Sequence, residues 1–336
     1  MHFAQKNISL QHGQSQFLRG SIQGADICEY RDAVSDSWDA SFVQLGAGNL
    51  DAGIEFLAGD GFSLYRESWQ QRLHLVGTLL PGMIAFGIPA GMGQESRWWG
   101  QPLSTNRIPI ARSISELNLV TEVKEAITVL TMREVDFLRI FEHLTGLPPG
   151  KFPGKGHFLE VKTVAPRQLL NFWNSVLAQT SVLDVCEWSI VDLVAPLLDA
   201  LVLPVVSHRV DTPKSTLLNR LMRAAEASDF RASVPEISFD LNISRRTIEH
   251  VYQEMIGKSP QAYFTLRRLN LCRQELTAAN HRETTVADIA TRFGFFELGR
   301  FASVYRRHFG ELPSNTLRRT RGLVSVGMHP SSDRTI

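Results

Sequence analysis

The sequence predicts an α+β fold, with an N-terminal β-rich, barrel-like domain, linker helices, and a C-terminal all-α domain. Three observations support this prediction. Short runs of β-branched and aromatic residues, separated by glycines, fill residues 20–132. Helical spacing of apolar residues begins near residue 133, and one helical motif occurs twice between residues 233 and 313. A chain of 336 residues has the length of two domains rather than one.

The predicted boundaries follow these changes of pattern. We expect an N-terminal domain at 1–205 (β-rich at about 20–132, helical at about 133–204), a linker at 206–215, a helical domain at 216–320 and a flexible tail at 321–336.

The β-rich region is typical of a small antiparallel sheet or barrel. "SFVQLGAGNLDAGIEFLAGDGFSLYRESW" (41–69) alternates short apolar runs with Gly, Asn and Asp turn residues. The run "AITVLTM" (126–132) is the last strand that the pattern predicts.

Three helices are expected next, at 133–144, 165–180 and 187–201. In the first, a stripe of Val135, Leu138, Phe141 and Leu144 is predicted to face the core. The second could pair two subunits or pack within its own domain. The apolar stretch 189–206 is expected to be buried in protein, because each Asp in it would cost about 2.5–3.5 kcal/mol at the centre of a membrane.

Charge is distributed unevenly along the chain. Residues 211–321 contain 18 Lys and Arg against 12 Asp and Glu, whereas the remainder contains 17 against 22. A basic C-terminal third on an acidic remainder indicates a polyanionic partner for that third alone.

Cysteine usage indicates a reducing compartment. Cys28, Cys186 and Cys272 are far apart and form no CxxC pair, which argues against a zinc ribbon or a disulfide framework. The first residues contain no apolar signal-peptide core, so a cytoplasmic protein is expected.

The C-terminal third contains an internal repeat. "SVPEISFDLNISRRTIEHVYQEMIGKSP" (233–260) aligns with "TVADIATRFGFFELGRFASVYRRHFGELP" (285–313). Each copy opens with an [ST]xx[DE] capping box, breaks, and begins a second helix near Ser244 or Glu297, 53 residues apart. Each copy is therefore predicted to be a helix-turn-helix, whose second helix enters the major groove of DNA.

The exposed positions of these second helices are the predicted DNA-binding residues. Arginine can form two hydrogen bonds to guanine, and glutamate can accept a hydrogen bond from cytosine. The arginine and glutamate residues near the starts of the two second helices could therefore read bases. The two arginines farther along the second helix are expected to contact phosphates. The predicted set is Arg245, Arg246, Glu249, His250, Leu298, Gly299, Arg300, Ser303, Arg306 and Arg307.

This third resembles the DNA-binding domain of the AraC/XylS family of bacterial transcription regulators. The resemblance lies in "IGKSPQAYFTLRRLNLCRQEL" (256–276), "VADIATRFGF" (286–295) and "GRFASVYRRHFGELPSNTLRR" (299–319). It implies one long helix, from Pro260 to about Thr277, between the two units. The family's base-contacting positions fall on Arg246, Glu249, His250, Leu298, Gly299, Arg300 and Ser303. This sequence departs from the family pattern at Asn242, where a turn glycine is usual, and at Glu297, where a small polar N-cap is common.

Candidates for catalysis or metal binding are weak. The segments 46–53 and 91–96 contain GxG without the third glycine of a nucleotide-binding loop, and no GxSxG is present. His74 and His157 are isolated, which favours structural histidines over metal ligands. We expect neither an enzyme, nor a metal site, nor a cofactor.

The N-terminal aromatics could line an effector pocket or form the domain's own core. The candidate effector-binding residues are Trp38, Phe56, Tyr65, Arg66, Trp69, His74 and Trp98. A wider set could orient a polar ligand group, namely Glu55, Arg66, Glu67, His74, Glu95 and Arg97.

The repeat and the basic C-terminal third predict a DNA-binding protein, and the family resemblance implies a sequence-specific transcription regulator, an effector-responsive activator of a neighbouring catabolic operon. Its expected partners are double-stranded promoter DNA, RNA polymerase, a small-molecule effector and a second copy of the chain. Resemblance to the XylS-type and ethanolamine-type subgroup suggests an amine or an aromatic acid as effector. The alternatives are an effector-independent dimeric regulator, or a DNA-binding domain fused to an unrecognised enzyme.

Overall fold

The computed structural model describes residues 8–12, 18–35, 37–90, 96–103, 107–112, 116–153, 158–162, 165–179, 189–202, 205, 207–208, 213–280 and 283–319. The predicted tail at 321–336 lies outside these residues, as do residues 206 and 209–212 of the predicted linker. The domain boundaries therefore stay predictions.

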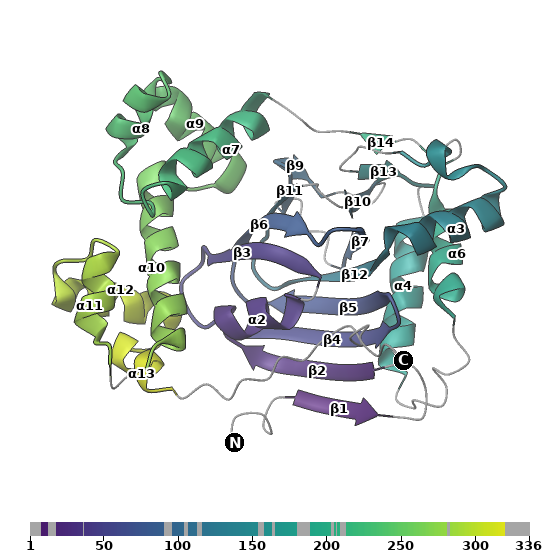
Figure 1. Cartoon of the computed structure of the whole chain (residues 1–336), viewed down its shortest axis with the longest axis horizontal. Coiled ribbons are helices and arrows are strands. Elements are labelled where there is room, and N and C mark those ends of the chain that lie inside the picture. The colour runs from purple at the N-terminus through teal and green to yellow at the C-terminus, as the bar shows by residue number, and fades with distance from the viewer. Residues whose placement is uncertain are drawn as a thin grey trace, which may run out of the picture.

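The N-terminal region contains a nine-stranded antiparallel sheet (Figure 1). In spatial order its strands are β1 (Ile8–His12), β2 (Leu18–Ala25), β4 (Ala52–Gly59), β5 (Phe62–Trp69), β12 (Glu125–Arg133), β7 (Met83–Pro89), β10 (Arg107–Arg112), β13 (Phe158–Glu160) and β14 (Ser207–His208). The prediction that residues 126–132 form the last strand was wrong. The two short strands that follow pair with β10 and with each other, across distances that no local pattern encodes.

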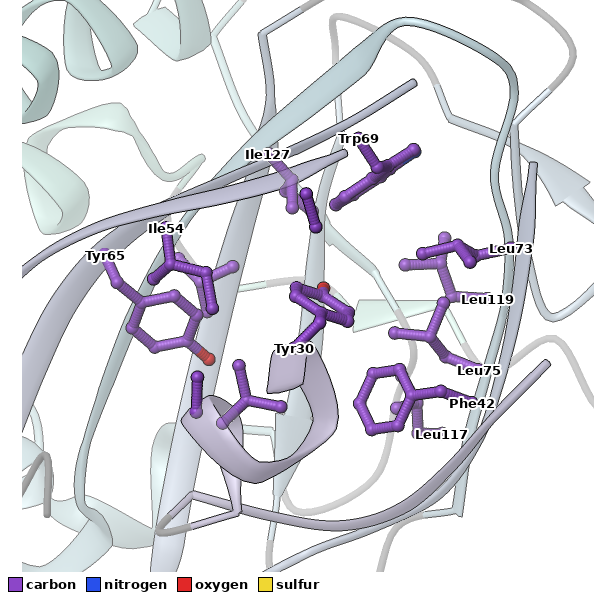
Figure 2. Packing of buried hydrophobic residues seen from close by; sticks show 14 of the residues in the cluster. Tyr30, Phe42, Ile54, Tyr65, Trp69, Leu73, Leu75, Leu117, Leu119 and Ile127 are labelled. Atoms are coloured by element: carbon purple, nitrogen blue, oxygen red, sulfur yellow. The ribbon is translucent and has the colours of Figure 1, made fainter. Parts of the chain in front are cut away.

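A second, five-stranded sheet faces the first. Its strands in spatial order are β3 (Trp38–Gln44), β6 (Leu73–Leu79), β11 (Glu116–Val120), β8 (Arg97–Trp98) and β9 (Gln101–Pro102). Side chains from both sheets meet in one hydrophobic cluster, in which Phe42 and Leu75 oppose Tyr65 and Ile127 (Figure 2). This cluster is the core of the β-rich domain.

A short helix, α2 (Ile27–Val34), interrupts the strands and was not predicted. Asp26 and Glu29 form a capping box at its start, with the Asp26 carboxylate accepting from the backbone N–H groups of Cys28 and Glu29. That D-x-x-E signal was readable in the sequence. The helix carries Tyr30 into the core between the sheets (Figure 2).

Helices α3 (Glu134–Thr145), α4 (Ala165–Ala178) and α6 (Ile190–Ala200) cover the other face of the nine-stranded sheet. The predicted core stripe of α3 was partly wrong, because Val135 and Leu144 are exposed and the buried face carries Phe137, Ile140 and Phe141. The apolar face of α4, including Trp173, packs within the domain. None of the described helices is long and apolar enough to span a membrane.

All regular elements described between residues 213 and 319 are helices. Its elements are α7 (Pro213–Glu226), α8 (Val234–Asp240), α9 (Arg245–Ile256), α10 (Pro260–Ala278), α11 (Val286–Arg292), α12 (Leu298–Phe309) and α13 (Pro313–Arg318). The predicted fold class, a β-rich domain with helices followed by a helical domain, is confirmed.

Candidate nucleic-acid interface

Both predicted capping boxes are present in the structure. Ser233 and Glu236 satisfy each other's backbone N–H groups at the start of α8, and Thr285 and Asp288 do the same at the start of α11. Exchanging these bonds satisfies free amides that a helix start otherwise leaves unpaired. The same local chemistry therefore starts both helix-turn-helix units.

A residue in the left-handed region makes each turn. Asn242 has φ of 52° and Gly294 has φ of 77°. Asparagine tolerates this conformation better than most side chains, and glycine adopts it freely. The substitution of Asn for the usual turn glycine thus preserves the turn of the first unit.

The second helices begin differently and end alike. Ser244 caps α9 by accepting from the N–H of Thr247 at 3.1 Å, whereas Glu297 makes no side-chain capping bond to α12. Both helices end at a left-handed glycine, Gly257 or Gly310. The start of α12 therefore keeps free N–H groups at its exposed end.

Helices α9 and α12 each present one buried and one exposed face. Ile248, Tyr252 and Met255 pack inside the first unit, and Phe301 and Tyr305 pack inside the second. The structure places all ten predicted DNA-binding residues on the exposed faces: Arg245, Arg246, Glu249, His250, Leu298, Gly299, Arg300, Ser303, Arg306 and Arg307. Their contact with DNA stays a prediction.

Five arginines on these faces have no acidic partner among the described residues: Arg245, Arg246, Arg300, Arg306 and Arg307. An unpaired guanidinium is available to a phosphate or a guanine without first breaking an ion pair. The two exposed faces therefore carry positive charge that is not neutralised by the described acidic side chains, which favours binding of a polyanion.

His250 is the exception on the α9 face. Its Nε2 lies 3.1 Å from a carboxylate oxygen of Glu254, which also accepts from Lys214. The Lys214 ammonium, bonded to this carboxylate, lowers the pKa of Glu254. A base contact by His250 would therefore compete with its intrahelical partner.

Helix α10 connects the two units by packing into both. Tyr263 and Phe264 near its start belong to the core of the first unit, and Cys272 and Leu276 near its end belong to the core of the second. One continuous helix shared by two cores fixes the relative position of α9 and α12.

The same helix lies against the five-stranded sheet (Figure 1). The Asn270 side chain accepts from the Gln44 N–H at 3.1 Å and donates to the Gln44 carbonyl at 3.4 Å. His308 of α12 also contacts this strand, with its Nε2 3.0 Å from the Gln44 carbonyl. The last residue of β3 thus binds both the connecting helix and α12, the second helix of the second unit.

Further polar contacts extend this interdomain surface. Arg267 donates to the Ser41 hydroxyl at 2.6 Å, and the Tyr263 hydroxyl lies 2.9 Å from His74 Nδ1. Beyond them, a charge cluster joins α2 to the C-terminal helices through Asp26, Arg273, Glu311 and Arg319. Apart from His74, which was expected to bind an effector, these residues were not predicted. The pairs that cross between the two regions join positions more than 180 residues apart, which nothing local in the sequence marks.

A cavity of about 50 Å³ lies between the two sheets. Three of the predicted effector-binding residues, Trp38, Tyr65 and Trp98, line it, together with Phe42 and Glu67. Glu67 belonged to the wider candidate set and sits two residues after Tyr65 on the same face of β5.

The other four predicted effector residues do not line this cavity. Phe56 and Trp69 are buried in the surrounding core, and Arg66 points to the opposite side of β5 from Tyr65. His74 points to α10, where burial lowers its pKa to about 3 and keeps it neutral beside Tyr263. The strand register decides which face of the sheet each of these side chains occupies, and the sequence pattern alone does not specify that register.

Among the described residues, no group of three or more His, Cys, Asp or Glu is placed to hold a metal ion. Cys28 and Cys272 are free and buried, and burial raises the pKa of the Cys28 thiol to about 11. Burial disfavours the thiolate form, which is the nucleophilic form of cysteine, so neither side chain has the surroundings of a reactive cysteine.

Comparison with known proteins places the similarity in the C-terminal region. A helix-turn-helix domain family matches residues 237–319. XylDLEGF operon transcriptional activator 1 of Pseudomonas putida is 39% identical over 79 residues, 24% of this chain and 24% of that protein. The probable thc operon regulatory protein of Rhodococcus erythropolis is 29% identical over 114 residues, 33% of this chain and 34% of that protein.

A solved structure of a probable AraC family transcriptional regulator from Rhodopseudomonas palustris is 32% identical, with a TM-score of 0.27. It covers 31% of this chain and 98% of that one. The chain spans about a quarter to a third of the length of the curated relatives it matches. The family match lies on the paired helix-turn-helix units of the C-terminal region.

Proposed function

We propose that this chain, which carries an AraC/XylS-type helix-turn-helix domain, is a sequence-specific transcription regulator that binds promoter DNA through α9 and α12. The observation that carries the proposal is the pair of exposed second helices, held by α10 and bearing five arginines without acidic partners among the described residues. Two such helices fixed on one connector suit successive major-groove segments on one face of a duplex. The chain would act in the bacterial cytoplasm, together with RNA polymerase.

We further propose that an effector in the β-rich domain regulates this binding, with activation of a neighbouring catabolic operon as the outcome. Support comes from the five-stranded sheet, which has the cavity on one face and α10 on the other. In β3, Phe42 faces the cavity while Ser41 and Val43 face α10. A ligand that prefers one arrangement of this sheet would shift the population of DNA-competent molecules.

A homodimer is part of the same proposal. Because the apolar face of α4 is already covered within its own domain, the dimer contact would use other residues. Two copies would place four recognition helices on one promoter.

Selection from a random DNA pool by the full chain tests the DNA-binding proposal. We expect a two-part motif that binds roughly 10³-fold or more tightly than unrelated duplexes at physiological salt. Equal affinity for selected and unrelated DNA would leave only electrostatic, non-specific binding and would contradict the proposal.

A further inference from the structure

The cavity between the two sheets combines aromatic walls with a single buried acid. Trp38, Phe42, Tyr65 and Trp98 contribute aromatic rings, and aliphatic side chains from both sheets close the remainder. Glu67 is 6% exposed and is the only residue lining the described cavity that can carry charge near neutral pH. This is an unusual place for a carboxylate, because burying one without a cation is costly.

Among the described residues, the hydrogen bonds around Glu67 include no positively charged partner. It accepts from the Tyr30 hydroxyl at 2.7 Å, and Tyr65, two residues earlier, accepts from the Trp38 indole at 2.6 Å. No Lys, Arg or His of the described chain lines the cavity. Burial raises the pKa of Glu67 to about 7, with the Tyr30 bond opposing the rise.

A second polar group in the cavity wall is also unsatisfied. The Trp98 indole N–H is buried and has no hydrogen-bond partner among the described residues. An ammonium ion only donates hydrogen bonds, so it does not pair with this N–H, and the Trp98 ring offers such a ligand its aromatic face alone. The indication of a missing cation comes from Glu67, a buried carboxylate without a cationic partner among the described residues.

We propose that this cavity binds a small apolar amine in its protonated form, with Glu67 as the counter-ion and Trp38, Phe42 and Trp98 as the aromatic wall. The inference rests on the proposed effector response and names the chemical class of the effector. Aromatic faces attract cations, and a carboxylate in a low-dielectric site does so more strongly than in water. An aromatic acid, the other class suggested by the sequence, would place its carboxylate beside Glu67 with no cation to balance the pair.

Entry of such a ligand must move the sheets. About 50 Å³ is far less than the roughly 150 Å³ that accommodates benzene in a protein core. Phe42 of β3, Leu75 of β6 and Leu119 of β11 line the cavity, so widening it displaces these three strands. Their neighbours on the other face, among them Val43 and Val120, pack against the C-terminal domain, which links occupancy to the position of α10.

Isothermal titration calorimetry of the full chain at pH 8 tests the class of ligand. The probes are isobutylamine and benzylamine, each compared with the alcohol and the carboxylate of the same carbon skeleton. We expect each amine to bind at least tenfold more tightly than its matched alcohol and acid. Glu67→Gln should abolish this preference, and Glu55→Gln, which removes an exposed acid from the neighbouring strand, should retain it.

The wild-type pH profile supplies a second readout that needs no variant. Amine affinity should fall between pH 8 and pH 6 as Glu67 takes up a proton, whereas alcohol affinity should not change. An alcohol or acid that binds as tightly as its amine, or no binding by any probe, would overturn the proposal. Mobility shifts of the same protein on its selected DNA test the DNA-binding function separately, so loss of one proposal is distinguishable from loss of the other.

Discussion

Glu67 and His74 are both buried, and burial shifts the pKa of each in the direction that favours its neutral form. Burial lowers the pKa of His74 to about 3, so this ring serves as an uncharged hydrogen-bonding group between Asn118 and Tyr263. Burial raises the pKa of Glu67 to about 7, so its charge changes within the physiological range. Of the two, only Glu67 can report on pH near neutrality.

Stability should therefore depend on pH through Glu67. Its folded pKa, about 7, lies above its ordinary value of 4.5, so the folded state holds more protons between these values. The free energy of unfolding should fall by up to about 1.4 kcal/mol per pH unit as pH rises through this window. Glu67→Gln should remove this contribution, and Glu55→Gln should not.

Urea denaturation of the three proteins between pH 5 and pH 8.5 measures the effect. A wild-type slope that Glu67→Gln leaves unchanged would show that Glu67 is not the responsible group.

Arg246 and Arg300 are predicted to read bases, one in each unit. Arg246→Ala or Arg300→Ala should each weaken binding to the selected DNA by about 1–3 kcal/mol and relax specificity within one half of the motif only. Arg306→Ala, a predicted phosphate contact, should weaken binding to all sequences alike and reduce the salt dependence of log K by about 1. Fluorescence anisotropy on point-substituted duplexes gives these values.

Equal weakening of all duplexes by Arg246→Ala would reassign that residue to the DNA backbone. Unchanged binding by Arg300→Ala would remove it from the interface.

At the scale of single elements, the C-terminal units could be predicted closely because their signals are local. Capping boxes, turn residues and terminal glycines specify each helix within a few positions of itself. In α3 the predicted core stripe was only partly right, since two overlapping apolar stripes share its sequence and packing against the sheet selects Phe137, Ile140 and Phe141. Short strands such as β13 depend on partners about 50 residues away and gave no local signal.

The left-handed turn at Gly294 is expected not to tolerate a side chain. Its φ is 77°, and a Cβ added there would lie 3.1 Å from a guanidinium nitrogen of Arg268, which leaves little room for a side chain. Gly294→Ala should destabilise the protein by about 1–2 kcal/mol. Gly299→Ala is the matched control, because that site lies in a helix with open space around it and should be neutral or stabilising by up to about 1 kcal/mol.

Urea denaturation of the full chain measures both substitutions. Equal stability of the two variants would contradict the requirement for a left-handed residue at this turn.

At the scale of the whole molecule, the five-stranded sheet is the structural link between the cavity and the recognition helices. Its inner face lines the cavity and its outer face contacts α10 through Ser41, Gln44 and His74. The sequence predicted both domains but not this contact, because it joins residues such as Gln44 and Asn270 that are 226 positions apart. The periodicity of apolar residues predicts helices and strands, but it does not predict which of them pack against each other across domains.

Asn270 tests this link directly. Asn270→Ala would leave the buried N–H of Gln44 without its acceptor, which should cost about 1–3 kcal/mol. Gln261→Ala, an exposed polar substitution on the same helix, should change stability by less than about 0.5 kcal/mol. Hydrogen exchange at Gln44 should accelerate only in the Asn270 variant; unchanged exchange there would show that the two domains are not held at this point.

The two helix-turn-helix units are expected to bind one duplex together. Footprinting of the full chain on DNA from its neighbouring intergenic regions, with and without benzylamine, measures whether they do. We expect two protected segments about one helical turn apart, roughly 34–36 Å, on the same face of the duplex. A single protected segment, or none, would contradict this expectation.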